Sequence, residues 1–142
     1  MPLLRYRTKD LTSLNYDTCA CGRTAVRMGK ILGRSDDMLI IRGVNVFPSQ
    51  IESVILQMPE FEPHYMIYVN RENNLDTMEL HVEARPDLYS DNVGTMISLT
   101  KKLTAQLNSI LGIAVKVKIV EPRSLARSEG KAKRVFDNRM LK

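Results

Sequence analysis

The chain has 142 residues, of which 44% are hydrophobic and 26% are charged, and its formal net charge is +5. This composition allows one packed domain, or one domain with a small piece of another, and argues against disorder throughout. No apolar run approaches the roughly 20 residues that span a bilayer, and no signal peptide follows Met1, so we expect a cytoplasmic protein without membrane contact. The positive charge favours anionic partners such as nucleotides, coenzymes or nucleic acid, although a surplus of this size is as often only a solvated surface.

The first 30 residues contain short β-like runs broken by Asp, Asn and Gly, without helical periodicity. Such a segment buries little by itself, so we expect strands and turns that belong against a partner surface. It holds the only two cysteines, Cys19 and Cys21, and a disulfide between residues i and i+2 has poor geometry. The pair therefore indicates half of a tetrahedral zinc site or, as the alternative, two reduced thiols in a loop.

A tighter pattern begins at Met38. The apolar string "MLIIRG" predicts a short strand, Arg42-Gly43 a turn, and "VNVF" a second strand. Ser49, with Glu52 three residues later, predicts a capping box at the start of an amphipathic helix over residues 49–58.

Residues 65–84 have the signature of a β-hairpin, with runs over 65–69 and 78–84 on either side of a polar turn at Asn73-Asn74. Alternation in the second run predicts one buried face and one wet face. We expect Met78, Leu80 and Val82 to be buried and Glu79, His81 and Glu83 to be exposed, with His81 an ordinary surface histidine.

Residues 91–112 predict the longest helix, ended by Gly112, and residues 115–120 predict a strand followed by a tail from Pro122. The helix carries an apolar stripe: Val93, Ile97, Thr100, Leu103, Leu107, Ile110 and Leu111. The order strand, helix, strand, strand, helix, strand predicts a ferredoxin-like βαββαβ α+β sandwich with both helices on one face of the sheet.

Three polar clusters contribute nothing to a core: residues 6–10, residues 33–37 together with Arg42-Gly43, and residues 128–134. Each alone has a plain explanation, because a solvated turn accounts for Asp36-Asp37 and "SEGKAKR" lacks the spacing of a P-loop. A lysine in a glycine-bearing loop is nonetheless suited to meet a phosphate or a developing negative charge.

In this order the clusters resemble those of the adenylate-forming acyl-CoA ligases, and most closely the phenylacetate–CoA ligase branch, over essentially the whole chain. "PLLRYRTKD" is similar to the segment that closes the family's large N-terminal domain, "GRSDDMLIIRGVNVFPSQIE" to its hinge and opening C-terminal strands, and "SEGKAKRV" to its final motif. The family usually has glycine where Lys9 stands. The resemblance implies that residues 1–35 end the N-terminal domain and hinge, and that residues 36–142 form a mobile C-terminal lid.

The resemblance also implies site residues and cofactors. In the family, ATP and Mg²⁺ activate an aryl-acetic acid such as phenylacetate, and coenzyme A then takes the acyl group. The implied roles are ribose binding by Asp10, nucleotide contact by Arg34, the hinge at Asp36, the coenzyme A tunnel at Arg42 and Gly43, and catalysis of adenylation by Lys131. Cys19 and Cys21 would complete a structural zinc site only with ligands from the missing domain.

Nothing in the chain resembles the family's phosphate-gripping loop or aryl-acid pocket. We therefore expect a C-terminal portion that is inactive alone, with residues 1–32 poorly ordered or self-associating. The alternative is a non-catalytic ferredoxin-like module, either regulatory or RNA-binding. RNA-recognition sheets stack bases on aromatics of their central strands, whereas here Tyr65 and Tyr68 fall on one strand only, so we expect no nucleic acid.

Overall fold

The structure, a computed structural model, describes residues 6–89, 93–127 and 133–139. The chain divides into two compact units, unit 1 (Met1–Met38) and unit 2 (Leu39–Lys142), and each is described by itself. The boundary that the resemblance places after residue 35 lies inside unit 1, within the short 3-10 helix η1 (Ser35–Asp37).

Unit 1 consists of two-residue strands and turns, as its sequence predicts. β1 (Asp10–Leu11) pairs antiparallel with β4 (Gly33–Arg34), and β2 (Leu14–Asn15) pairs antiparallel with β3 (Arg27–Met28). Most of its large apolar side chains are exposed: Tyr6, Leu11, Leu14, Tyr16, Val26, Met28, Ile31 and Leu32. Backbone pairing, not a core, gives this unit its form.

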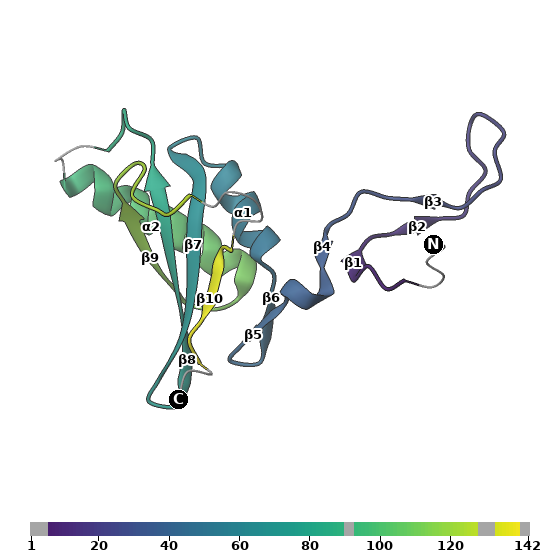
Figure 1. The fold of residues 1–142 in the computed structure, drawn as a ribbon. Coiled ribbons are helices and arrows are strands. Elements are labelled where there is room, and N and C mark those ends of the chain that lie inside the picture. The colour runs from purple at the N-terminus through teal and green to yellow at the C-terminus, as the bar shows by residue number, and fades with distance from the viewer. Residues whose placement is uncertain (1–5, 90–92, 128–132, 140–142) are drawn as a thin grey trace. The chain divides into compact units, whose positions relative to one another are not determined.

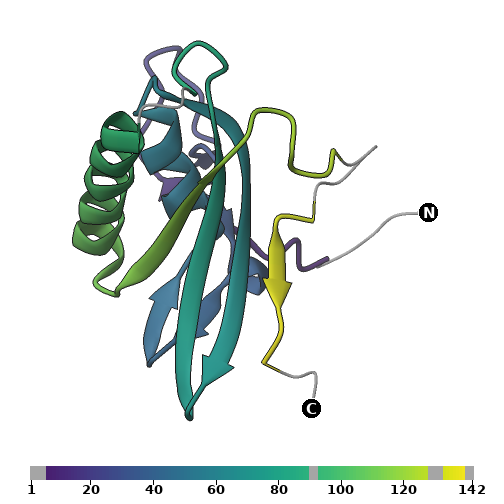
Figure 2. The ribbon, with the colours of Figure 1, turned by 90° about the vertical axis from the view of Figure 1, so that its left-hand side faces the viewer.

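Unit 2 is built around a four-stranded sheet with the order β10-β7-β8-β9. β7 (Phe61–Glu72) and β8 (Leu75–Ala84) form the central antiparallel hairpin, and β9 (Val115–Val120) and β10 (Val135–Asp137) pair with them in parallel at the two edges. Two helices, α1 (Pro48–Leu56) and α2 (Val93–Leu111), cover one face of this sheet (Figures 1 and 2). The predicted α+β class, with helices on one face, is confirmed.

The strand composition of the sheet differs from the prediction. The opening strands, β5 (Leu39–Ile41) and β6 (Val44–Val46), pair only with each other within the described residues. The sheet takes its fourth strand from β10, which lies in the segment expected to be a tail. β10 has three residues and a partner strand more than 60 positions earlier, so no local periodicity marks it.

The predicted turn and helix end are confirmed. Asn73 and Asn74, between β7 and β8, both have left-handed backbones (φ 49° and 64°), which is the type I′ geometry that tight hairpins prefer. Gly112 follows α2 with a φ of +69°, and its N–H bonds the carbonyl oxygen of Asn108 at 3.0 Å.

The start of α1 corrects the predicted capping box of Ser49 and Glu52. The helix begins at Pro48, and the Gln50 side chain accepts the Phe47 N–H at 2.9 Å. Proline at the first helical position has no N–H that would need an acceptor, and the cap is Phe47, two residues earlier than the Ser49 hydroxyl suggests. Glu52 instead pairs with Arg134.

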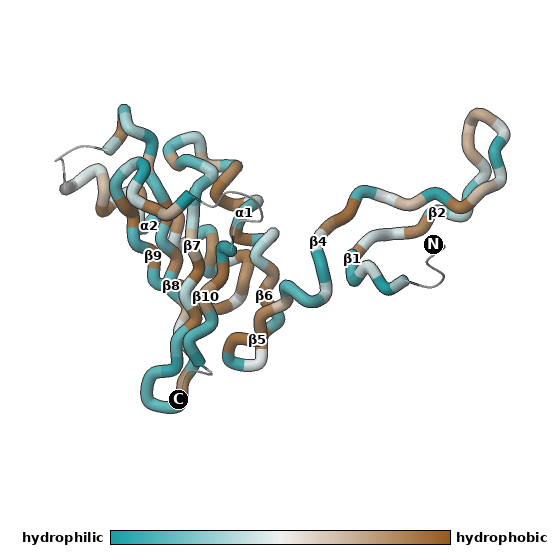
Figure 3. Tube along the Cα trace, in the orientation of Figure 1, coloured by the Kyte–Doolittle hydropathy of each residue, from teal (hydrophilic) through white to brown (hydrophobic). Residues whose placement is uncertain are grey.

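The core of unit 2 lies between the sheet and the two helices. In Figure 3, hydrophobic residues (brown) recur along these strands and helices. In α2 the buried positions are Leu103, Leu107 and Leu111, at a spacing of four residues, whereas Ile97 and Ile110 lie on the flanks and stay about half exposed. The predicted stripe was therefore too wide. Among the described residues, neither helix combines the length and apolarity that a membrane crossing requires.

Candidate functional site

Two residues that the resemblance assigns to the nucleotide face each other in unit 1. Asp10 on β1 is the direct cross-strand partner of Arg34 on β4. The Asp10 N–H donates to Thr8 Oγ1 at 3.4 Å, within the same turn. The short antiparallel pairing is what brings positions 10 and 34 together.

Asp36 is held by two cations of the same unit. The Arg34 Nε and Nη2 atoms each donate to one Asp36 carboxylate oxygen at 2.9 Å, and Lys9 Nζ lies 3.4 Å from Oδ2. The hydrogen bonds from Arg34 hold the pKa of Asp36 far below its ordinary value and raise the pKa of Arg34. All three side chains are at least one-third exposed, so the cluster fixes local geometry more than it adds stability.

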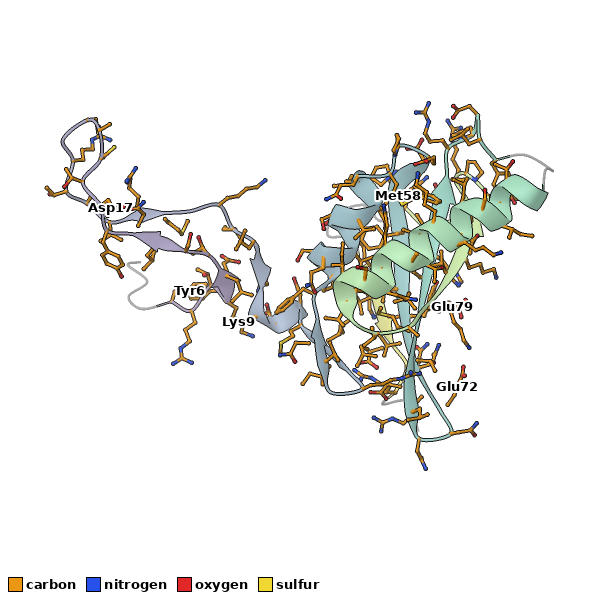
Figure 4. All side chains as sticks on the ribbon, turned by 180° about the vertical axis from the view of Figure 1, so that it is seen from behind. Tyr6, Lys9, Asp17, Met58, Glu72 and Glu79 are labelled. Atoms are coloured by element: carbon orange, nitrogen blue, oxygen red, sulfur yellow. The ribbon has the colours of Figure 1, made fainter. Side chains whose placement is uncertain are left out.

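Lys9 departs from the family's glycine, and its backbone shows why glycine suits the position. Its φ is +65°, in the left-handed region that costs a residue with a Cβ free energy. Its carbonyl oxygen accepts the Ser35 N–H at 2.7 Å, which ties this turn to η1. The turn and η1 line an open surface pocket, and Figure 4 labels two of its lining residues, Lys9 and Tyr6. The lining residues are Tyr6, Arg7, Thr8, Lys9, Ser35 and Asp36.

In unit 2, Arg42 and Gly43 form the turn between β5 and β6. Their φ values of 51° and 80° give a two-residue turn of type I′, so the predicted turn is confirmed. The resemblance also implied that Gly43 lies on a strand, and this is wrong, because Gly43 lies in the turn. A Cβ built on Gly43 would meet no atom of the described structure within 4 Å. The space in front of Gly43 is therefore open, and the backbone angle is what requires glycine.

A cluster of charged residues surrounds this turn. Arg42 Nε donates to the Asp76 carbonyl oxygen at 2.6 Å, and the Asp76 carboxylate pairs with Arg71 and Arg139, each at 2.9 Å. Arg139 also pairs with Asp137 at 2.6 Å. We call these residues the Asp76 cluster. Sequence reasoning missed all but Arg42, because the partners come from segments far apart in the chain.

Lys131 lies outside the described residues, but both of its flanks are anchored to the sheet. Before it, the Glu83 carboxylate accepts the Leu125 N–H at 2.9 Å and the Arg127 Nη2 at 2.7 Å. Glu83 is almost completely buried, which corrects its predicted place on a wet face. Burial alone would raise the pKa of Glu83, but the donors from Leu125 and Arg127 outweigh it and lower the pKa.

After Lys131, Arg134 forms the second anchor. Its Nη1 contacts the Glu52 carboxylate of α1 and lies 3.3 Å from the Tyr65 hydroxyl oxygen, and its guanidinium lies 4.9 Å from the Tyr65 ring centroid. Its carbonyl oxygen accepts the Ile67 N–H at 2.8 Å. Burial raises the pKa of Tyr65, so its hydroxyl stays protonated beside Arg134.

His81 is not an ordinary surface histidine. Its Nε2 lies 2.6 Å from Glu79 Oε1, and its ring centroid lies 4.7 Å from that of Tyr68. Phe136 of β10 stacks on Tyr68 at 5.3 Å. Tyr65 and Tyr68 both lie on β7, as predicted, and Tyr65 is buried in the core. The rings of His81 and Phe136 join Tyr68 from the two neighbouring strands.

Cys19 and Cys21 lie in one turn of unit 1, closed by a hydrogen bond from the Gly22 N–H to the Cys19 carbonyl oxygen at 2.8 Å. Both are free thiols, and hydrogen bonds from Cys21 lower the pKa of Cys19. No three His, Cys, Asp or Glu side chains come together for a metal in the described parts of the chain. The zinc site implied by the resemblance therefore stays a prediction.

The chain matches known proteins along most of its length. Residues 43–139 match the model of the AMP-binding enzyme C-terminal domain. The chain is 48% identical to a phenylacetate-coenzyme A ligase of Thermus thermophilus and covers 34% of that relative, with 98% of this chain aligned. The chain thus spans about a third of the length of the curated relatives it matches.

Solved structures give the same result. The chain is similar to 2-hydroxyisobutyryl-CoA ligase in complex with R3-HIB-AMP (TM-score 0.80, 34% identity, 94% of this chain and 28% of that one). The same ligase has also been solved with 2-HIB-AMP and CoA in a thioesterification state (TM-score 0.70, 34% identity, the same coverage). A domain of a Bacteroides vulgatus phenylacetate-coenzyme A ligase matches with a TM-score of 0.67 and 38% identity, covering 73% of this chain and 94% of that domain. The chain therefore belongs to the family of AMP-binding enzyme C-terminal domains, the C-terminal portion of adenylate-forming ligases.

Proposed function

We propose that the chain is the mobile C-terminal lid of an ATP-dependent aryl-acid–CoA ligase, with phenylacetate as the first substrate to test. In the first half-reaction, the acid's carboxylate attacks the α-phosphate of ATP, and pyrophosphate leaves. In the second, the thiol of coenzyme A attacks the acyl carbon of the adenylate, a thioester forms, and AMP leaves. The match to phenylacetate-coenzyme A ligases and the anchored segments of unit 2 support this proposal.

The observation that carries the proposal is the separation of two anchors, Arg134 and Arg139, which lie at opposite ends of β10. The Arg134 carbonyl oxygen accepts the Ile67 N–H before β10, and Arg139 Nη1 donates to the Ile40 carbonyl oxygen, two residues before the Arg42–Gly43 turn, after β10. Five extended residues span about 16 Å. We infer from this separation that the two segments act in different half-reactions, and that a lid swinging between two positions presents them in turn.

In the first position, Lys131 would offset the repulsion between two approaching anions. A carboxylate and an α-phosphate both carry negative charge, and an ammonium between them stabilises the transition state more than the ground state. Mg²⁺, when bound, neutralises the pyrophosphate. No group of metal-ligating side chains forms among the residues described here, so its ligands would be the phosphates and the N-terminal domain.

In the second position, the Arg42–Gly43 turn would border the path of the coenzyme A thiol. The open space in front of Gly43 leaves room for a narrow pantetheine chain, which a side chain would fill. Unit 1 supplies the other proposed contacts: the Asp10 carboxylate accepts the ribose hydroxyls, and the Arg34 guanidinium contacts the nucleotide through nitrogen not engaged by Asp36. Asp36 is the proposed hinge, and Cys19 with Cys21 the proposed half of a structural zinc site.

Substitution of Lys131 in the complete ligase tests the proposal. Lys131→Ala should slow phenylacetate-dependent exchange between pyrophosphate and ATP by about a hundredfold or more, because a preorganised charge is lost. Thioester formation from supplied phenylacetyl-adenylate and coenzyme A should continue. Lys133→Ala is the matched control, because it also removes an ammonium from this segment. That ammonium lies 5.3 Å from the Phe136 ring centroid, and its loss should leave the exchange rate unchanged.

Retention of the exchange activity by Lys131→Ala would overturn the catalytic role.

Two further measurements test the proposal. The purified 142-residue chain should release no AMP from ATP, phenylacetate and coenzyme A. Indoleacetate offered to the complete enzyme tests the identity of the acid.

A further inference from the structure

The Arg42–Gly43 turn belongs to a hairpin that has few backbone bonds of its own. β5 and β6 have three residues each and, within the described residues, pair only with each other. An isolated two-stranded hairpin is at best marginally stable in water. Burial of Ile41 and Val46 in the core fixes one face of the hairpin. Polar contacts from other segments must hold its other side.

Two arginines supply these contacts: Arg42, which is part of the turn, and Arg139, which lies after β10. Arg42 reaches from the turn to β8, where its Nε donates to the Asp76 carbonyl oxygen at 2.6 Å. Arg139 reaches from the segment after β10, and its Nη1 donates to the Ile40 carbonyl oxygen at 2.6 Å. The hairpin is thus bonded to β8 on one side and to the C-terminal segment on the other.

The carboxylate of Asp76 joins these two contacts. Its Oδ2 accepts Arg139 Nη1 and its Oδ1 accepts Arg71 Nε, both at 2.9 Å. The Asp76 and Arg139 side chains are only 12% and 17% exposed, so their attraction is screened less than that of a surface pair. Asp137 bonds the Nε and Nη2 of Arg139 and so orients its guanidinium plane toward Ile40.

We propose that Asp76 and Arg139 are positioning residues that hold the Arg42–Gly43 turn in the place where coenzyme A passes during thioester formation. This inference rests on the function proposed above. Neither residue has to touch coenzyme A, because both act through the turn. Their loss should let the turn move, and a displacement on the order of 1 Å can cost about a hundredfold in rate.

The test compares the two half-reactions in the complete ligase. Asp76→Asn keeps the backbone carbonyl that Arg42 bonds but removes the charge that holds Arg139. It should slow thioester formation from phenylacetyl-adenylate, or raise the KM for coenzyme A, by about tenfold or more. Pyrophosphate exchange should stay within about twofold of the wild type, because adenylation does not use the turn. Asp76→Glu keeps the carboxylate and should retain more thioester activity than Asp76→Asn.

Arg139→Lys is the second variant, and Glu72→Gln is the matched control. Lysine keeps the charge of Arg139 but cannot span Asp76, Asp137 and Ile40 with one planar group, so it should show the same selective loss. Glu72 pairs with Lys116 at 3.6 Å on an exposed part of the same β7–β8 hairpin (Figure 4), and its substitution should change neither half-reaction.

Equal slowing of both half-reactions by Asp76→Asn and Arg139→Lys would overturn the inference, because it would mean a general loss of structure. An unchanged thioester rate and an unchanged KM for coenzyme A would overturn it as well. If Asp76→Asn does not fold, the Arg139→Lys result decides. Failure of the proposed function can be told apart from failure of this inference, because the wild-type ligase would then perform neither half-reaction.

Discussion

Unit 2 anchors its two proposed functional segments in different ways. The Arg42–Gly43 turn is contacted directly by the Asp76 cluster, whose members are partly exposed. Near Lys131, the described contacts lie on its two flanks, with the buried Glu83 before it and Arg134 after it. The described contacts therefore hold the turn at the point of its proposed action, and near Lys131 they hold the two flanks. Substitutions at the two places should affect different half-reactions and change the free energy of unfolding by different amounts.

The largest effect should come from Glu83→Gln, which would sharpen this comparison. The variant keeps an acceptor for the Leu125 N–H but removes the buried charge that Arg127 pairs with. We expect the free energy of unfolding to fall by about 1–3 kcal/mol. Denaturant unfolding of the 142-residue chain measures this loss, and in the complete ligase adenylation should slow more than thioester formation.

Asp87→Asn provides the control for Glu83→Gln. Asp87 also pairs with an arginine, Arg85 at 3.0 Å, but both side chains are about half exposed. Its loss should change stability by less than about 0.5 kcal/mol. Equal losses in the two variants would show that burial of Glu83 adds nothing to the anchor.

Gly43→Ala and Gly43→Asn should have an intermediate effect on stability and separate backbone strain from obstruction. Alanine at a φ of +80° should cost about 1 kcal/mol, whereas asparagine tolerates this region better and should cost less. Both side chains enter the open space before the turn, so both should slow thioester formation. If Gly43→Asn kept the wild-type rate, the space would not lie on the path of the thiol. Thermal unfolding and the thioester assay measure the two effects.

The smallest effect should come from Lys9→Gly in unit 1. Glycine removes the strain of a left-handed residue and should increase local stability by about 1 kcal/mol or less. Lys9→Ala is the matched control, because it removes the same ammonium but keeps the strain. Hydrogen exchange at the Ser35 N–H, which bonds the Lys9 carbonyl oxygen, measures the difference. Slower exchange in Lys9→Ala than in Lys9→Gly would contradict the explanation.

The sequence predicted the parts of the fold that depend on neighbours in the chain. Asn73-Asn74, Gly112 and the runs around them were predicted correctly, because turn geometry and periodicity are local properties. β10 escaped prediction because it has three residues and pairs with a distant strand. Ser49 was a plausible cap, but Gln50 reaches the Phe47 N–H instead.

The site divides in the same way. The turn at Arg42 and Gly43 was predicted correctly because its motif is contiguous, whereas its role on the path of coenzyme A stays a prediction. Asp76, Arg139 and Glu83 were missed as anchors, since each acts on a segment at least 30 residues away in the chain. Glu83 even follows the alternation of an exposed face, and it is buried because the segment around Leu125 covers it.

The bond from Arg139 to Ile40 has a consequence for how unit 2 can be rebuilt. It places the second residue of the unit beside one of its last described residues, so the polypeptide almost closes into a ring. A short glycine-rich linker could join those ends, and new termini could be opened in an exposed loop elsewhere. Such a circular permutant would keep its hydrophobic core, but the rest of the polypeptide would be attached at a different loop of the unit.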